Sequence, residues 1–502
     1  MGSSNEGHRD EECVECRTAL VIGGGLAGIA AAVVLAERGV KVTLIERETF
    51  LGGRAGAWED RLADGTPFQM ERGFHAFFRQ YYNLRALLRR VDPTLSFLAP
   101  MQDYPLLGPN GARESFKDLP RTTPLNIIEL VRRSPAITLV DLTRVSAARA
   151  AAMLAFDPER TPERWDRMNA AEYLDSLGFP AHARRMLFDV FAHSFFNPEP
   201  EYSAAELLAM FHFYFLGNPE GLVFDCCTEP FSTAFVEPLT RYLEERGVEI
   251  VRGTSVDQIE HAPDARFVAY AGGRRFEAAH CVLAVSVPTL RAIVSASPDL
   301  LHAEARRDVL AQGTTLPFAV WRLWLDRKVR ADRAPFAGTT GLGLIDNISV
   351  FEKLEGESRA WSERTGGSVI ELHAYAVPRD RDEAAIKADL LRGLHALYPE
   401  TRDARVIEER FLLREDCPAF PPGGHARRPG VVTDTPGLYL AGDYVKLPFA
   451  SALMERATSS GFIAANAIVR GLGEREEPVR RPPTHGLFTR PTLSAAIAQL
   501  RR

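Results

Sequence analysis

The sequence predicts an α/β protein built around a parallel sheet, and two observations support this fold class. The first is a strand, helix and strand in close succession, at residues 19–23, 26–38 and 40–46. Because fewer than 30 residues hold all three elements, the crossover should be right-handed and the strands parallel. The second is a glycine-rich turn that joins the first strand to the helix.

Length and composition agree with a globular protein of more than one domain. The chain has 502 residues, which exceeds the size of one ordinary core. Its net charge of −6 argues against a nucleic-acid partner. Six cysteines imply no disulfide scaffold and favour a reduced, cytoplasmic setting. No second pair has zinc-site spacing relative to Cys13 and Cys16, so we expect no metal site.

Residues 19–36 contain no charge and approach the length that flags a membrane span, about 18 residues. Glycines divide this run into a strand, a turn and a helix, and acidic residues precede it. We therefore expect neither a transmembrane span nor a secretion signal here.

The remaining elements follow from hydrophobic period and turn residues. A helical pattern extends from about residue 126 to residue 216. We expect strands at residues 248–251, 256–260, 266–271, 275–278, 281–285 and 437–441, strands of a different sheet at residues 319–325 and 368–376, and helices at residues 382–398 and 451–470.

The turn after the first strand carries the pattern Gly-x-Gly-x-x-Gly, and each glycine has a mechanical role. Gly23 allows the tight turn, Gly25 lets a pyrophosphate approach the backbone, and Gly28 lets the helix pack closely on the strand. The helix then begins at Leu26 and Ala27, whose free N–H groups and partial positive charge favour phosphate.

A carboxylate at the end of the second strand completes this pattern. Glu46 follows Gly28 by 18 residues and can accept hydrogen bonds from ribose hydroxyls, and Arg47 stands beside it. Together with the glycines, this arrangement predicts a Rossmann-type dinucleotide-binding domain. Its binding site should include Glu46 and Arg47.

The segment Leu51-Gly52-Gly53-Arg54 narrows the dinucleotide to FAD. It resembles the extended FAD fingerprint of the amine oxidase and carotenoid desaturase superfamily. The resemblance implies that Gly53 brings backbone close to the cofactor and that Arg54 lies beside the phosphate and the flavin.

Two distant segments resemble the same superfamily. Residues 247–250 followed by Val256 resemble the strand that places a backbone amide on the adenine. Residues 438–443 resemble the C-terminal Gly-Asp motif, which implies that Gly442 and Asp443 contact the ribityl chain or the pyrophosphate.

The resemblance continues in the helix that follows, with one departure. Met454 and Glu455 match the family pattern, and Met454 is expected at the cofactor. The next residue is usually glycine in the superfamily and is Arg456 here, which puts the local backbone path in doubt.

The implied fold is a discontinuous Rossmann-type FAD domain of the glutathione-reductase-2 and amine oxidase type, with an inserted α+β substrate domain. The expected domains are an FAD-binding domain at residues 18–100, 235–300 and 425–475, a substrate domain at residues 101–234 and 301–424, a disordered tail at residues 1–17 and a C-terminal extension at residues 476–502.

The segment at residues 71–75 runs along the flavin ring in the superfamily, which places Gly73 and Phe74 at the cofactor. Residues 73–84 and 213–221 closely resemble one branch, the bacterial carotene desaturase/methyltransferases of the isorenieratene synthase type. These enzymes turn a β-ionone ring into an aromatic ring, and Arg456 is normal in this branch.

The resemblance implies hydride transfer from a β-carotene-like ring to FAD, migration of one methyl group and loss of a proton. A base or cation stabiliser is then needed, and the candidates are His75, His212, Asp225 and Glu229. For His75 the alternative is a residue that only positions the flavin. The electron acceptor is oxygen or a quinone, because no second nucleotide motif appears.

A carotenoid substrate implies contact with a membrane. Residues 126–149 combine apolar side chains with arginines, so they could lie in an anionic interface. The alternative is a buried helix pair with exposed arginines. The expected location is cytoplasmic, on the inner face of the membrane.

Three other functions stay open at this point. A desaturase of phytoene or another linear carotene uses the same fold, as does a flavin amine oxidase. A flavin-binding protein without turnover belongs to a different class.

Overall fold

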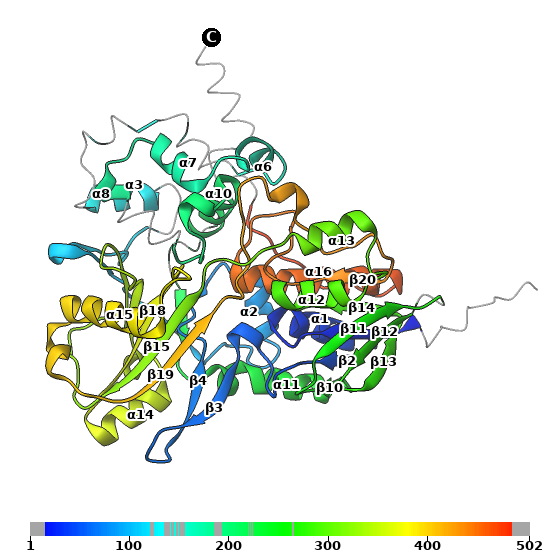
Figure 1. Cartoon of the computed structure of the whole chain (residues 1–502), viewed down its shortest axis with the longest axis horizontal. Helices are drawn as coiled ribbons and strands as arrows, with labels where there is room; N and C mark the ends of the chain where they lie inside the picture. Colours follow the sequence, from blue (N-terminus) through cyan, green and yellow to red (C-terminus); the bar gives the residue numbers. More distant parts are fainter. Residues whose placement is uncertain are drawn as a thin grey trace, which may run out of the picture.

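The computed structural model describes residues 16–120, 125–134, 141, 145–146, 149, 156–184, 193–218, 220, 222, 224–263 and 266–483. Two large sheets organise these residues, one parallel with five strands and one largely antiparallel with seven strands (Figure 1). The tail and the extension predicted at the two ends of the chain lie partly outside the described residues.

The five-stranded sheet has the order β10-β2-β1-β14-β20, and all of its pairings are parallel. Its strands are β1 (Thr18–Ile22), β2 (Lys41–Ile45), β10 (Glu249–Val251), β14 (His280–Leu283) and β20 (Leu438–Leu440). β1 lies in the middle of this sheet because residues 19–22 are all apolar, and a central parallel strand is buried on both faces.

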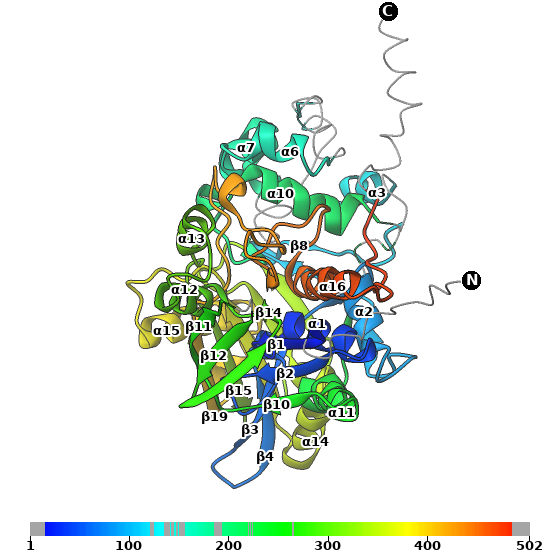
Figure 2. The ribbon, with the colours of Figure 1, turned by 90° about the vertical axis from the view of Figure 1, so that its right-hand side faces the viewer.

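Helices α1 (Leu26–Glu37) and α16 (Leu453–Gly471) pack against each other on one side of this sheet (Figure 2). A side chain at Gly461 of α16 would meet the carbonyl oxygen of Ala27 at 2.2 Å, so glycine permits this close approach. The run first considered as a membrane span forms β1 and α1 in the interior. None of the helices in the described part of the chain is long and apolar enough to cross a membrane.

The other side of the parallel sheet is covered by a small antiparallel sheet and a helix (Figure 2). These elements are β11 (Val256–His261), β12 (Phe267–Ala271), β13 (Arg274–Ala278) and α12 (Val287–Ala296). Helices α2 (Tyr82–Leu88), α11 (Glu237–Glu244) and α13 (Ala303–Leu310) complete this half of the molecule.

The seven-stranded sheet has the order β19-β15-β18-β17-β16-β7-β8. Its strands are β7 (Leu106–Leu107), β8 (Arg113–Glu114), β15 (Phe318–Leu325), β16 (Phe336–Thr339), β17 (Asn347–Val350), β18 (Ser368–Ala374) and β19 (Val406–Arg414). Helix α15 (Glu383–Leu397) buries Ile386, Leu390 and Leu394 in the same hydrophobic cluster as β15 and β18. Helix α14 (Gly356–Thr365) lies at the lower left of Figure 1.

Two smaller sheets and a group of helices connect these halves. The sheets are β3 (Ala57–Arg61) with β4 (Pro67–Glu71), and β5 (Phe77–Phe78) with β9 (Phe224–Cys227) and β6 (Leu98–Pro100). The helices at the top of Figure 1 are α3 (Leu125–Arg133), α6 (Arg160–Trp165), α7 (Ala170–Ser176), α8 (Ala181–Arg184) and α10 (Ala204–Phe211). A π-helical turn, His212–Leu216, follows α10.

Candidate active site

One cavity joins the carboxyl ends of the parallel strands to the seven-stranded sheet. This edge of an open parallel sheet is where ligands bind in such folds. We call its first part the dinucleotide groove, and it contains the predicted cofactor residues Gly23, Gly25, Leu26, Ala27, Glu46, Arg47, Gly53, Arg54, Val256, Gly442, Asp443 and Met454. Phe74 also lines the cavity.

The wall of the groove at the start of α1 is backbone. Gly25 is the N-cap of α1, and a side chain placed there would have only the Cα of Gly53, 3.9 Å away, as a neighbour within 4 Å. Gly25 also forms a bridge with Gly52. Two glycine-rich segments therefore face each other at a helix N-terminus, which fits a pyrophosphate.

Gly28 does not line the cavity. A side chain at Gly28 would lie 1.9 Å from the carbonyl oxygen of Gly23, so its role is the close packing of α1 on the first turn. Gly73 is also outside the lining. It has φ +95°, and a side chain there would lie 2.5 Å from Nε2 of His373.

Glu46 reaches the groove from the end of β2. The N–H of Gly24 donates to its Oε2 at 2.6 Å, and the N–H of Glu48 donates to its Oε1 at 2.9 Å. Each carboxylate oxygen keeps further acceptor capacity, so the group can also bind ribose hydroxyls. The neighbouring Arg47 is largely exposed and pairs with Glu48.

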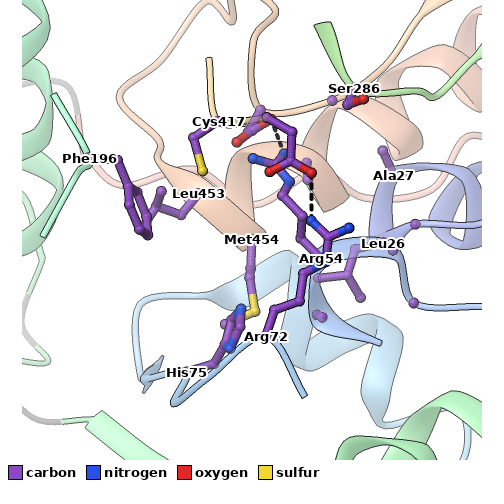
Figure 3. A pocket seen from close by; sticks show the side chains of 18 of the residues that line it. Leu26, Ala27, Arg54, Arg72, His75, Phe196, Ser286, Cys417, Leu453 and Met454 are labelled. Atoms are coloured by element: carbon purple, nitrogen blue, oxygen red, sulfur yellow. Dashed lines mark hydrogen bonds and ion pairs between the residues drawn. The ribbon is translucent and has the colours of Figure 1, made fainter. Parts of the chain in front are cut away.

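Arg54, labelled in Figure 3, lines the groove and meets Asp443 from the other end of the chain. Nη2 of Arg54 lies 2.5 Å from Oδ1 of Asp443, across 389 residues of sequence. Burial alone would lower the pKa of Arg54, but Asp443 raises it above its usual value, so the guanidinium stays charged. A fixed positive charge beside the glycine-rich backbone fits the phosphates of FAD.

Arg456 explains the departure from the superfamily pattern. Its buried guanidinium pairs with Glu206 and donates to the backbone oxygens of Ser451 and Asp443. Glu206 also pairs with Arg428, and these two arginines lower the carboxyl pKa to about 2 although burial would raise it. The arginine side chain thus supports the backbone at Asp443.

His75 lines the cavity, and Met454 lies beside it in Figure 3. Nδ1 of His75 lies 2.7 Å from the carbonyl oxygen of Gly73. Because a carbonyl only accepts, Nδ1 carries the proton and Nε2 is the free acceptor. Burial, together with the nearby His373 and Arg54, lowers the pKa of His75 to about 4, so the imidazole is neutral at pH 7.

The structure does not bring the other three catalytic candidates to the cavity. Asp225 is held by Arg85 at 2.5 Å and by Arg79 at 3.5 Å. His212 is fully buried and contacts the carbonyl oxygen of Pro483 at 2.7 Å. Glu229 is exposed. We therefore assign none of these three side chains to the reaction.

Alternation along a strand explains the placement of Asp225. Phe224 precedes it on β9 and lines the cavity, so the next side chain points to the opposite face. The sequence by itself gave no evidence about which face of this strand the carboxylate occupies.

Sequence analysis did not single out three polar residues that line the cavity, namely Asn347, His373 and Tyr375. A signal existed, because Glu371, His373 and Tyr375 alternate within the strand expected at residues 368–376. Cys417 also lines the cavity, and burial raises its thiol pKa to about 12, so it stays protonated.

A further part of the lining is aromatic. We call this part the aromatic chamber, and it is defined by the rings of Phe74, Phe78, Tyr104, Tyr214, Phe224 and Phe336. Phe74 stacks on Phe336 with ring centroids 4.5 Å apart, and Phe224 lies 4.7 Å from Tyr104. Because the groove and the chamber belong to one cavity, an apolar ligand in the chamber would lie next to a cofactor in the groove.

Comparison with known proteins identifies the class. The family model "Flavin containing amine oxidoreductase" matches residues 26–469. The chain belongs to this family and is an FAD-dependent oxidoreductase. This result confirms the predicted cofactor and the predicted Rossmann-type FAD domain with an inserted substrate domain.

Within the family, the similar proteins are carotenoid enzymes. The chain is 48% identical over 466 residues to the carotenoid phi-ring synthase of Streptomyces griseus, across 93% of this chain and 90% of that protein. It is 29% identical over 607 residues to the carotenoid phi-ring synthase of Chlorobaculum tepidum, across 95% of this chain and 92% of that protein. The predicted resemblance is therefore confirmed.

Solved structures show the shared fold. Cyclohexylamine oxidase from Brevibacterium oxydans has a TM-score of 0.67 at 16% identity, covering 91% of this chain and 99% of that chain. Wild-type putrescine oxidase bound to putrescine has a TM-score of 0.66 at 16% identity, covering 90% and 99%.

Proposed function

We propose that the chain oxidises a carotenoid and converts a β-ionone ring into an aromatic ring, with migration of one methyl group. The observation that carries this proposal is the aromatic chamber, which opens directly onto the dinucleotide groove. The names of the two phi-ring synthases that the chain resembles support the same reaction.

The chamber suits a rigid apolar ring because the hydroxyl groups of its tyrosines are bonded to other protein groups. The hydroxyl of Tyr104 donates to the carbonyl oxygen of Leu222 at 2.6 Å. The hydroxyls of Tyr81 and Tyr214 share a hydrogen bond of 2.7 Å. The surface offered to a ligand is therefore mostly ring face, as expected for an apolar pocket with few polar groups.

FAD held in the dinucleotide groove would supply the hydride acceptor, once for each of the two dehydrogenations that aromatisation of the ring needs, with reoxidation by the electron acceptor between them. The chain orients the ring and excludes water, so that a carbon-centred cation survives long enough for the methyl group to move. Aromatic faces attract positive charge, and the rings of Phe74, Phe224 and Phe336 surround this space. The neutral His75 adds no repulsive charge, and its Nε2 is available as an acceptor.

An amine substrate fits this cavity less well. No lysine lines the cavity in the described residues. Asp346, a carboxylate that lines the cavity, already accepts from the N–H of Tyr375 at 2.5 Å and contacts His193 at 2.9 Å. A cationic amine would have to compete with both contacts.

A pigment experiment tests the proposal. Cells that accumulate β-carotene and matched cells that accumulate phytoene would each express the chain, followed by chromatography and mass spectrometry. We expect an aromatic-ring product from β-carotene only. Unchanged β-carotene with desaturated phytoene would instead support the linear desaturase, and peroxide released with amines would support an amine oxidase. The electron acceptor, oxygen or a quinone, can be assigned from which of them reoxidises the reduced protein.

We also propose peripheral contact with the inner face of the membrane through α3. Residues 135–140, 142–144 and 147–148 of the basic stretch at residues 126–149 lie outside the described residues. On α3, Leu125 is 54% exposed and Ile128 is 58% exposed, one helical turn apart. Nearby Arg132 and Arg133 share Glu129. Such a combination of exposed apolar and basic side chains is typical of an interfacial helix.

Co-sedimentation with anionic vesicles tests this contact. The double variant Leu125→Ser, Ile128→Ser should remain in solution while the wild-type chain sediments. Val432→Ser, which replaces a 64% exposed apolar residue elsewhere, is the matched control. Equal sedimentation of the wild type and the double variant would contradict the proposal.

A further inference from the structure

We infer that Glu371, His373 and Tyr375 form a proton relay that takes up a proton lost by the substrate ring. This inference rests on the proposed function and names the residues that complete its chemistry. Glu371 and His373 alternate along β18, so they project from one face of the seven-stranded sheet, and Tyr375 follows directly after the strand. His373 and Tyr375 line the cavity.

The relay is a continuous set of hydrogen bonds. Oε1 of Glu371 lies 2.8 Å from Nε2 of His373, and Nδ1 of His373 lies 2.8 Å from the hydroxyl of Tyr375. The amide of Asn347, which pairs with His373 in the β17–β18 register, donates to the same hydroxyl at 2.9 Å. Every contact is within normal hydrogen-bond distance.

The charge on Glu371 fixes one end of the relay. Nε of Arg322 donates to its Oε2 at 2.9 Å, and both side chains are buried in the sheet. Burial alone would raise the carboxyl pKa, but Arg322 and His373 lower it to about 2. The group is therefore a carboxylate, which can only accept hydrogen bonds.

This carboxylate determines which atom donates and which accepts in each hydrogen bond of the relay. The backbone N–H of Phe74 lies 2.9 Å from Oε1 of Glu371 and 3.4 Å from Nε2 of His373, so it donates to the carboxylate. Nε2 lies 2.8 Å from the same unprotonated carboxylate, so Nε2 of His373 is the N–H group in this contact. In a neutral imidazole, Nδ1 is then the acceptor, and the hydroxyl of Tyr375 donates to it. The oxygen of Tyr375 is left to accept, from Asn347 on one side and from a ligand in the cavity on the other.

The proton step balances without another reagent. A C–H bond next to the substrate cation breaks, and its electron pair forms the new ring double bond. The proton goes to the oxygen of Tyr375 as the hydroxyl proton moves to Nδ1 of His373. The imidazolium that forms lies against the Glu371 carboxylate, and the same path reversed returns the proton to water after the product leaves.

The relay is better suited to this step than either neighbouring group alone. Burial raises the pKa of Tyr375 above its ordinary value, so an isolated phenol would be a poor acceptor. The pKa of His75 is lowered to about 4, so a proton placed there is weakly held. His373 combines a path to the cavity, through Tyr375, with a carboxylate partner, Glu371.

Turnover measurements on purified FAD-loaded protein test the relay. Tyr375→Phe keeps the ring and removes the proton path, so we expect kcat to fall about 100-fold with KM changed by less than about twofold and FAD content unchanged. His373→Gln should give a similar fall. Tyr202→Phe is the matched control, because it deletes a fully buried hydroxyl, bonded to Sδ of Met210, outside the cavity.

A spectroscopic measurement separates a relay from a structural role. In protein labelled with ¹⁵N-histidine, the resonances lost in His373→Gln should show a protonated Nε2 and a hydrogen-bonded, unprotonated Nδ1. Tyr375→Phe should move the Nδ1 resonance toward that of a free acceptor and leave the N–H of Nε2 in place. A protonated Nδ1 in the wild type would overturn the inference.

The outcomes distinguish the inference from the proposed function. If the wild type converts β-carotene and Tyr375→Phe does so at an equal rate, the relay is overturned and the function stands. A raised KM at unchanged kcat would also overturn it, because Tyr375 would then only bind the substrate. If the wild type leaves β-carotene unchanged, the proposed function fails, and the inference fails with it.

Discussion

The dinucleotide groove and the aromatic chamber belong to one cavity but are built in different ways. Glycine backbone, a helix N-terminus and an ion pair form the groove. Side chains from many separate segments form the chamber. A groove made of backbone tolerates few residue types at each position, whereas a chamber made of side chains tolerates many that fill the same space. Substitutions in the two parts should therefore have separate effects on FAD and on the substrate.

The largest effect is expected where the groove depends on close backbone packing. Gly28→Ala would place a methyl group 1.9 Å from the carbonyl oxygen of Gly23, which forces α1 away from its turn. We expect a loss of about 3 kcal/mol or more in unfolding free energy and no bound FAD. Flavin absorbance and denaturant unfolding would measure both. Gly471→Ala has no neighbour within 4 Å and should retain FAD and stability.

The next effect concerns charge in the groove. Arg54→Gln leaves Asp443 without its partner and removes a positive charge from the phosphate site. We expect FAD to bind about 100-fold more weakly, consistent with loss of one partner of a buried charge pair. Isothermal titration of the apoprotein would measure this affinity. Arg61→Gln, at an exposed pair with Glu59, is the control, and equal affinities would contradict a role for Arg54.

A smaller effect is expected beside His373, and it concerns turnover and not FAD binding. Gly73→Ala would place a methyl group 2.5 Å from Nε2 of His373 and displace the imidazole. We expect FAD content to be kept and turnover to fall about tenfold. Gly65→Ala is matched for positive φ, at +84° against +95°, but has no neighbour within 4 Å. A similar fall in both variants would show that backbone strain, not His373, causes the effect.

The smallest expected effect is a pH dependence of stability from His75. The unfolded chain binds a proton below about pH 6.5, whereas the fold resists it until about pH 4, so stability falls as pH decreases through this window. Between pH 6.5 and 5.5 the wild type should lose about 1 kcal/mol more than His75→Gln. Urea unfolding at the two pH values would measure the difference. An identical loss in both proteins would show that His75 titrates normally.

The part of the groove at the start of α1 could be predicted because its determinants are local, whereas Asp443, 389 residues from Arg54, was predicted only through the family resemblance. The strand expected at residues 19–23 is β1, and the helix expected at residues 26–38 is α1. The strands expected at residues 319–325 and 368–376 are β15 and β18, in a different sheet as predicted. Strands β16, β17 and β19 were not predicted, because their short or weakly alternating runs gain stability from pairing with distant neighbours.

Candidate catalytic residues showed the limit of the sequence more clearly. Asp225 and His212 lie close in sequence to aromatic residues of the chamber, yet neither side chain reaches the cavity. His373, by contrast, lies on β18, an interior strand of the seven-stranded sheet, and Tyr375 follows directly after that strand. Nothing in their local sequence indicates that the chain brings this sheet to the flavin edge of the parallel sheet.

The sequence by itself determined the parallel α/β fold, because the glycine spacing between the first strand and helix acts over a short distance, and its resemblance to a known family indicated FAD and the distant residues of the groove. The tertiary structure alone decided which side chains form the chamber, and it placed Asp225, His212 and Glu229 outside the cavity. It also oriented the hydrogen bonds of Glu371, His373 and Tyr375. These features depend on which faces of distant strands meet, and that is settled only when the two sheets pack together.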